Sequence, residues 1–247
     1  MKILIVHAHP EPMSFCSALQ REAVEALRAQ GHEVQVSDLY DSGFNPIASS
    51  ADFGSRKDPD YLVYAVEQRH GYTAGGIAPD IQSELAKLLW CDLLILNFPV
   101  FWCAPPAVMK GWFDRIWLSG PIYGGMRFYE RGGLRGKRAL CTVTIGAQEH
   151  MYQPGGIHGS LLDMLKPVLQ GTLAYSGMDV LPPFVAWHVP YVSDAERKSM
   201  LLEYRRRLAD LGSAEVLQFP RMDAYDNQLR PLVNLQDRES LCLVKSL

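Results

Sequence analysis

The sequence has few of the features that mark secreted, membrane-bound or nucleic-acid-binding proteins. It contains five cysteines, and none forms a C-x-x-C pair or a zinc-ligand spacing. They are Cys16, Cys91, Cys103, Cys141 and Cys242. An odd number of thiols, mostly in or beside apolar segments, predicts reduced cysteines, no bound metal and a cytoplasmic location. No apolar run reaches the ~20 residues of a membrane-spanning helix, and the net charge of −3 offers no basic surface for nucleic acid.

A signal peptide is not expected either. The apolar stretch at residues 1–6 is short and leads into predicted structure without a cleavage-like region. The hydrophobic fraction of 48% and the charged fraction of 21% are ordinary for a globular protein. Since no internal repeat is visible, we expect one domain over residues 1–212. An extended tail over residues 213–247 is expected to pack on this domain rather than form a second one.

Strand-like and helix-like segments alternate along the chain. Strands are predicted at residues 2–8, 33–39, 91–98, 137–145 and 180–187. Helices are predicted at residues 14–29, 79–89, 105–117, 160–175 and 193–211, with Ser14 and Ser193 as N-caps. This order predicts a doubly wound α/β fold with a mainly parallel five-stranded sheet and helices on both faces. Residues 40–78 are predicted to be irregular, and loops of this length are usually functional.

The common catalytic signatures are missing. The chain has no G-x-G-x-x-G fingerprint, no G-x-S-x-G nucleophile elbow and no pair of carboxylates at a strand end. It has instead three loops that follow predicted parallel strands, where open α/β sheets bind their ligands. A chain without a strong nucleophile is typical of an enzyme whose cofactor carries the chemistry.

The first of these loops, residues 7–15, ends at a predicted helix N-terminus. Free backbone amides and Ser14 favour a phosphate or pyrophosphate there. His9 is expected to contact that phosphate, because no second ligand is spaced to make a metal site with it. The alternative is a capped helix without a ligand.

The second loop, residues 98–106, carries Phe101, Trp102 and three prolines. This composition predicts a rigid apolar wall that suits a flat ring system. Hydrophobic packing and a subunit interface are the alternatives.

The third loop, residues 146–158, places Tyr152 and His158 six residues apart among three glycines. A phenol and an imidazole can hydrogen-bond there, and the imidazole can change its charge near neutral pH. The alternative is a tight loop with a half-buried tyrosine and a surface histidine.

Several short motifs occur in a fixed order over residues 3–211. They read L-I-V-x-A-H, S-F, D-L-Y, F-N-P-I, K-D-P, P-D-I, F-P, K-G-W-F-D-R and M-Y-x-x-x-G-I-H-G. Together they resemble the flavodoxin-like NAD(P)H:quinone oxidoreductases, the DT-diaphorase family. The resemblance implies an FAD-containing homodimer with flavin sites shared between the subunits. It also implies two-electron, ping-pong hydride transfer from NADH or NADPH to quinones.

The resemblance also implies roles for individual residues. Tyr152 and His158 match the catalytic pair. The residues that match flavin contacts within one subunit are His9, Ser14, Phe15, Cys16, Pro99, Val100, Trp102, Cys103, Ile145, Gly146, Ala147, Arg197 and Leu201. Ile47, Tyr64 and Asp114 match residues that contact the flavin from the neighbouring subunit. The substrate site matches Trp102, Cys103, Tyr123, Tyr175 and His158.

These matches imply a division of labour around the flavin. The Tyr152 hydroxyl and the amides near Gly146 and Ala147 are expected to stabilise negative charge at its N1/O2 side. His158 is expected to support Tyr152 or to take up the proton, and the pair can protonate the quinone oxygen. The adenine contacts that include Arg197 favour FAD over FMN.

The sequence departs from the family pattern at five positions. Cys16 stands where asparagine is usual, Ala147 where glycine is usual, and Ser160 where an acidic residue is usual. Cys103 and Gly125 replace aromatic residues, so a more open substrate pocket is expected.

Three other functions stay open on the sequence. An FMN-dependent azo- or nitroreductase has the same fold, and some relatives serve as ancillary subunits of potassium-efflux systems. A one-electron FMN carrier is disfavoured by the small net charge of −3. The physiological acceptor, the choice between NADH and NADPH, and the role of the tail are not determined.

Overall fold

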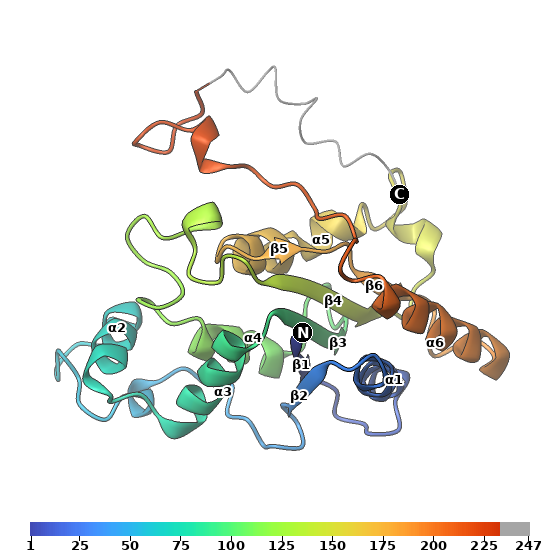
Figure 1. Cartoon of the computed structure of the whole chain (residues 1–247), viewed down its shortest axis with the longest axis horizontal. Helices are drawn as coiled ribbons and strands as arrows, with labels where there is room; N and C mark the ends of the chain where they lie inside the picture. Colours follow the sequence, from blue (N-terminus) through green and yellow to red (C-terminus); the bar gives the residue numbers. More distant parts are fainter. Residues whose placement is uncertain (233–247) are drawn as a thin grey trace.

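The computed structural model describes residues 1–232, which form a sheet with helices on both sides (Figure 1). The strands are β1 (Lys2–His7), β2 (Glu33–Asp38), β3 (Leu93–Pro99), β4 (Arg138–Thr144), β5 (Asp179–Val180) and β6 (Phe184–Ala186). Their order is β2-β1-β3-β4-β5, with β6 also beside β4, and every one of these pairings is parallel. This order confirms the predicted doubly wound α/β fold.

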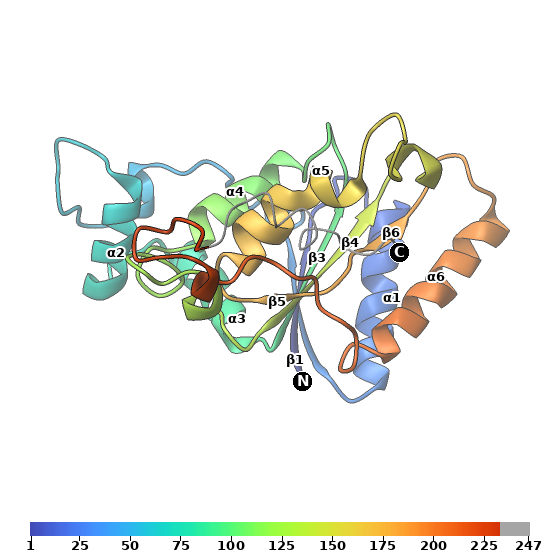
Figure 2. The ribbon, with the colours of Figure 1, turned by 90° about the horizontal axis from the view of Figure 1, so that it is seen from above.

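The helices divide between the two faces of the sheet. They are α1 (Phe15–Ala29), α2 (Tyr64–Ala74), α3 (Pro79–Trp90), α4 (Ala107–Ile116), α5 (Leu161–Val168) and α6 (Asp194–Ala209). α1 and α6 cover one face, and α3, α4 and α5 cover the other (Figure 2). Ile3 and Ile5 of β1 pack with the first group, and Leu4 and Val6 pack with the second. All of β3 is buried, which explains its nearly continuous apolar sequence.

Most element ends follow the predicted signals. The side chain of Ser14 caps α1, and Ser193 forms a capping box at the start of α6, as predicted. The helix predicted at residues 160–175 is instead α5 followed by a π-helical segment, Leu169–Ala174. Pro167 lies just before this change, and it has no N–H to continue the α-helical hydrogen bonds.

The outer strand predicted at residues 180–187 is divided into β5 and β6. Pro182 and Pro183 separate the two pieces, because a proline cannot donate a ladder hydrogen bond. Both pieces pair with β4, so they share one outer position of the sheet.

The prediction that residues 40–78 are irregular is wrong. This segment contains a 3₁₀ turn at Ser50–Asp52 and the helix α2. The buried positions of α2 are Glu67, Gln68 and Gly71, so the helix has no apolar stripe that periodicity could reveal.

Residues 213–232 form the described part of the predicted tail. The N–H of Leu217 donates to the carbonyl of Val180 at 2.7 Å, which ties this segment to β5. Residues 233–247, with Cys242, lie outside the described residues. That the whole tail packs on the domain therefore stays a prediction.

The described part of the chain contains neither a candidate membrane-spanning helix nor a candidate metal site. None of its helices is long and apolar enough to cross a lipid bilayer. Within residues 1–232, no three His, Cys, Asp or Glu side chains are grouped so that they could hold a metal ion.

Candidate active site

The loops after β1, β3 and β4 lie at the carboxyl edge of the sheet, as predicted. The chain leaves β1 towards α1 on one face and β3 towards α4 on the other, and such a reversal opens a crevice between the loops. The rings of His9 and Phe101 lie 6.4 Å apart and connect the first loop to the second. The N–H of Val100 donates to the carbonyl of Thr144 at 3.0 Å and connects the second loop to β4.

The first loop leads into a helix end suited to an anion. The hydroxyl of Ser14 accepts the N–H of Ser17 at 3.1 Å and caps α1. The N–H groups of Phe15 and Cys16 open the helix, where no preceding turn offers carbonyl acceptors. Together with the helix dipole, these amides favour a phosphate.

His9 stands beside this helix end with a defined proton position. Its Nδ1 accepts the N–H of Glu11 at 2.9 Å, so the neutral ring carries its proton on Nε2. Burial lowers the pKa of His9, which keeps the imidazole neutral at pH 7. The Nε2–H group can therefore donate a hydrogen bond to a phosphate oxygen.

A buried polar network beneath the first loop was not predicted. The amide of Asn97 donates to Nδ1 of His7 at 2.9 Å and to the carbonyl of Cys16 at 2.9 Å. Nε2 of His7 then donates to the hydroxyl of Ser17 at 3.1 Å. Burial lowers the pKa of His7, which is only 2% exposed. The network fixes the start of α1 against β1 and β3. The only sign of it in the sequence is that His7 and Asn97 are polar residues within apolar strands.

The second loop carries the predicted aromatic wall on a strained turn. Phe101 and Ala104 exchange two backbone hydrogen bonds of 2.9 and 3.1 Å. Trp102 and Cys103 between them have φ angles of 49° and 61°, as in the type I′ turns that Asn and Gly usually form. An L-residue with this conformation costs about 1–2 kcal/mol. Trp102 is also 100% exposed, so its indole is free to contact a ligand.

Tyr152 and His158 lie together in the third loop, as predicted. Their ring centroids are 5.0 Å apart, and the Tyr152 ring lies 5.7 Å from Trp187. The loop closes tightly, since the N–H of His158 donates to the carbonyl of Met151 at 2.9 Å. A Cβ at Gly156 would lie 2.6 Å from that same oxygen, so only glycine fits there. Burial raises the pKa of Tyr152, so its phenol stays protonated and can donate a hydrogen bond.

Hydrogen bonds hold the backbone that follows β4, next to Tyr152 and His158. The N–H of Ile145 donates to the carbonyl of Ala186 at 2.9 Å. His188 holds the next two residues, because its N–H donates to the carbonyl of Ala147 and its Nδ1 lies 3.0 Å from the carbonyl of Gly146. The backbone at residues 145–147 is therefore rigid.

Arg197 and Leu201, predicted to contact adenine, lie in the first half of α6. The guanidinium of Arg197 binds Asp194 at 2.8 Å and the carbonyl of Val189 at 3.2 Å. These contacts orient its planar group, and Leu201 is half-buried against the α1 side of the sheet.

The predicted substrate residues Tyr123 and Tyr175 and the predicted flavin contact Asp114 lie outside the three loops. Asp114, Tyr123 and Tyr175 line a cavity of about 210 Å³ together with Trp117. The rings of Tyr123 and Tyr175 are 6.4 Å apart. None of the lining residues belongs to the three loops. This cavity and the three loops are therefore separate surfaces of the chain.

Ile47 and Tyr64 are also predicted to serve a neighbouring subunit. Ile47 lies in the segment before α2, and Tyr64 is the first residue of α2. The Ile47 side chain is 68% exposed. The Tyr64 hydroxyl donates to Oδ2 of Asp52 at 2.6 Å, and its ring packs edge-on against Phe53 at 5.1 Å. Burial pushes the pKa of Asp52 upwards, but hydrogen bonds from Arg115, Tyr64 and Ser49 overcome this and hold it below its usual range.

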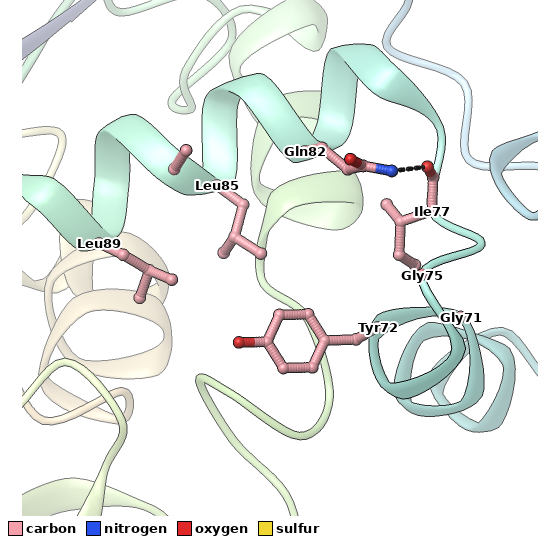
Figure 3. A pocket seen from close by; sticks show the side chains of 8 residues that line it. Gly71, Tyr72, Gly75, Ile77, Gln82, Leu85 and Leu89 are labelled. Atoms are coloured by element: carbon pink, nitrogen blue, oxygen red, sulfur yellow. Dashed lines mark hydrogen bonds between the residues drawn. The ribbon is translucent and has the colours of Figure 1, made fainter.

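A different cavity, of about 280 Å³, lies between α2 and α3 (Figure 3). Tyr72, Leu85 and Leu89 line it, and the side chain of Gln82 turns away to the carbonyl of Ile77. It contains none of the predicted site residues.

Several known proteins are similar to this chain in sequence and fold. A family model described as a flavodoxin-like fold, Flavodoxin_2, matches residues 1–208. NAD(P)H dehydrogenase (quinone) 1 from Cavia porcellus is 37% identical over 226 residues, which are 91% of this chain and 82% of that protein. Ribosyldihydronicotinamide dehydrogenase (quinone) from Mus musculus is 39% identical over 215 residues, which are 87% and 93% of the two chains. A solved structure from Klebsiella pneumoniae, described as a candidate quinone reductase, is 33% identical with a TM-score of 0.91 and covers 100% of this chain and 97% of its own. The chain therefore belongs to the flavodoxin-like NAD(P)H dehydrogenase (quinone) family of oxidoreductases.

Proposed function

We propose that the protein is an FAD-dependent homodimer that carries two electrons from NADH or NADPH to quinones. The observation that supports this most is the strained turn that exposes the indole of Trp102, next to the amide-rich start of α1. A flat ring system joined to a phosphate is the ligand chemistry that suits both features at once. The donor and the acceptor are inferred from relatives named NAD(P)H dehydrogenase (quinone).

The chain offers contacts along the whole of such a cofactor. Residues proposed to hold the flavin ring are Pro99, Val100, Trp102 and Cys103, with Ile145, Gly146 and Ala147 at its pyrimidine edge. Residues proposed to hold the pyrophosphate and the adenine half are His9, Ser14, Phe15, Cys16, Arg197 and Leu201. The partner subunit is proposed to add its own copies of Ile47, Tyr64 and Asp114.

FAD, when bound, supplies the two-electron carrier between the nicotinamide and the quinone. The protonated phenol of Tyr152 would donate a hydrogen bond towards negative charge at the pyrimidine edge of the flavin. His158, whose ring lies 5.0 Å from that of Tyr152, holds the proton that a reduced quinone oxygen takes up. Tyr123 and Tyr175 of the partner subunit would cover the acceptor and exclude water.

FAD is preferred to FMN because the α6 residues Arg197 and Leu201 need an adenine half to contact. Arg197 is already oriented by Asp194, so less side-chain freedom is lost when a ligand binds. Flavin released from the purified protein and separated by chromatography distinguishes the two. FMN would instead favour an azo- or nitroreductase on the same fold.

The central experiment uses the purified protein. We expect a flavin absorption spectrum, a dimer in sedimentation, and NAD(P)H oxidation that depends on added quinone with ping-pong kinetics. A protein without flavin or diaphorase activity that binds a membrane transport partner would contradict the proposal. That result would favour an ancillary subunit of a potassium-efflux system.

A further inference from the structure

Two buried polar side chains organise the surface that is proposed to complete the neighbouring subunit's site. Arg115 on α4 is 3% exposed, and Gln68 on α2 is 2% exposed. The residues proposed to act on the neighbouring site are Ile47, Tyr64, Asp114 and Tyr123. Although they come from four different segments, each is connected to Arg115 or Gln68 by the contacts that follow.

Arg115 holds the segment before α2 against α4. Its Nε and Nη2 donate to Oδ1 of Asp52 at 3.2 and 2.7 Å. Its Nη1 donates to the carbonyl of Asn45 at 2.9 Å and to Asp80 at 2.5 Å. The ring of Phe44 lies 5.1 Å from the guanidinium carbon. One guanidinium thus fixes both ends of residues 45–52 and connects them to α3.

These contacts determine where Ile47 and Tyr64 lie. The N–H of Ile47 donates to Oδ1 of Asn45 at 3.0 Å, directly beside the carbonyl that Arg115 binds. The Tyr64 hydroxyl donates to the same Asp52 carboxylate that Arg115 pairs with, at 2.6 Å. Movement of this guanidinium would therefore displace both residues.

Gln68 fixes the positions of the other two residues, Asp114 and Tyr123. Its Nε2 donates to the carbonyl of Asp114 at 3.3 Å. Its Oε1 accepts the N–H of Ser119 at 3.1 Å and the hydroxyl of Tyr123 at 3.2 Å. One amide thus joins α2 to the end of α4 and to the substrate tyrosine.

We propose that Arg115 and Gln68 are positioning residues that act on the neighbouring subunit's site. Neither residue needs to touch flavin or substrate, because each fixes the side chains that do. This inference rests on the proposed shared-site homodimer. It adds that the geometry of one subunit's active site is set by a buried hydrogen-bond network in the other subunit.

Gln68→Met is the sharper test, because it keeps the side-chain length and removes only the hydrogen bonds. Loss of Arg115 would leave the buried carboxylate of Asp52 unpaired and endanger folding. We expect the Gln68→Met homodimer to stay dimeric and keep its flavin, while kcat/KM for a quinone such as menadione falls about ten- to hundredfold. Arg115→Lys, which keeps the charge but not the paired geometry, is the second variant if Gln68→Met does not fold.

Mixed dimers, assembled from two differently tagged chains, separate action within a subunit from action on the neighbour. In the first dimer, one chain carries Gln68→Met and the other carries Tyr152→Phe with His158→Gln. In the second dimer, one chain carries all three changes and the other is wild type. If Gln68 acts on the neighbour, the first dimer retains about half of the wild-type activity, since one of two sites is complete. The second dimer then shows only about half of the low activity of the Gln68→Met homodimer, since its single catalytically competent site faces the altered chain.

Low activity of the first dimer with about half of the wild-type activity in the second would overturn the inference, because it would show that Gln68 serves its own subunit. Equal activities of the two mixed dimers would also overturn it. Wild-type protein that is monomeric or lacks flavin would instead contradict the proposed function. The wild-type control, measured first, therefore distinguishes the two failures.

Discussion

Replacing Trp102 by alanine tests whether the exposed indole exists to bind the cofactor. The side chain is 100% exposed, so its removal takes away no packing within the chain. Alanine is also an L-residue and keeps the same backbone strain at φ 49°. We therefore expect the free energy of unfolding of the flavin-free protein to change by less than about 0.5 kcal/mol.

The expected loss in binding follows from the area that the indole offers. A tryptophan side chain can bury up to ~250 Å², and a flat ring against one face would cover roughly 100 Å² of it. At about 25 cal/mol per Å², this contact contributes about 2.5 kcal/mol. FAD affinity should therefore weaken about 60-fold.

The assay titrates flavin-free protein with FAD by flavin fluorescence and records thermal unfolding of the same samples. Tyr72→Ala is the matched control, since Tyr72 is 45% exposed on α2 and lies away from the three loops. An unchanged FAD affinity in Trp102→Ala would refute the role of the turn. A clear fall in the melting temperature of flavin-free Trp102→Ala would show that the indole packs on its own chain.

Four further substitutions test other parts of the structure. Tyr152→Phe removes a charge-stabilising donor and should slow flavin reduction by NAD(P)H about a hundredfold in stopped flow, as should His158→Gln; unchanged rates would exclude the assignment. His7, whose pKa burial lowers from 6.5, binds fewer protons folded than unfolded below that pH, so urea stability should fall with decreasing pH. This slope should be smaller in His7→Gln, and equal slopes would assign the effect to other groups. The indole N–H of Trp117 is buried and unpaired within residues 1–232, and its ring packs on Trp112 and Phe113. In Trp117→Phe the relieved desolvation of this donor opposes the packing lost with the smaller ring, so the free energy of unfolding should change by less than about 1 kcal/mol. A loss of more than about 2 kcal/mol would show that this N–H has a hydrogen-bond partner in the folded protein.

The sheet could be predicted because its signals are local and strong. β3 is apolar along almost its whole length, and Ser14 and Ser193 stand directly before their helices. α2 escaped prediction because its buried face contains a carboxylate and an amide instead of apolar side chains. Glu67 is buried because it accepts the N–H groups of Lys57 and Asp58 at 2.7 and 3.0 Å, a loop contact that periodicity does not encode.

The candidate site was predicted in outline, because loops after parallel strands meet at one edge. Its supporting contacts could not be predicted, since they join residues that are distant in the sequence. His7 and Asn97 are 90 positions apart, and Asp52 and Arg115 are 63 apart. The turn at Trp102 was also hidden, because this turn type normally carries Asn and Gly, and only the fold imposes it on a tryptophan.

The divided outer strand also affects how the molecule behaves at high concentration. An open sheet edge can recruit strands from other molecules and start aggregation. Here Pro182 and Pro183 offer no N–H groups at that edge, and Leu217 already occupies the carbonyl of Val180. This border of the sheet is therefore a poor template for strand addition from a second molecule.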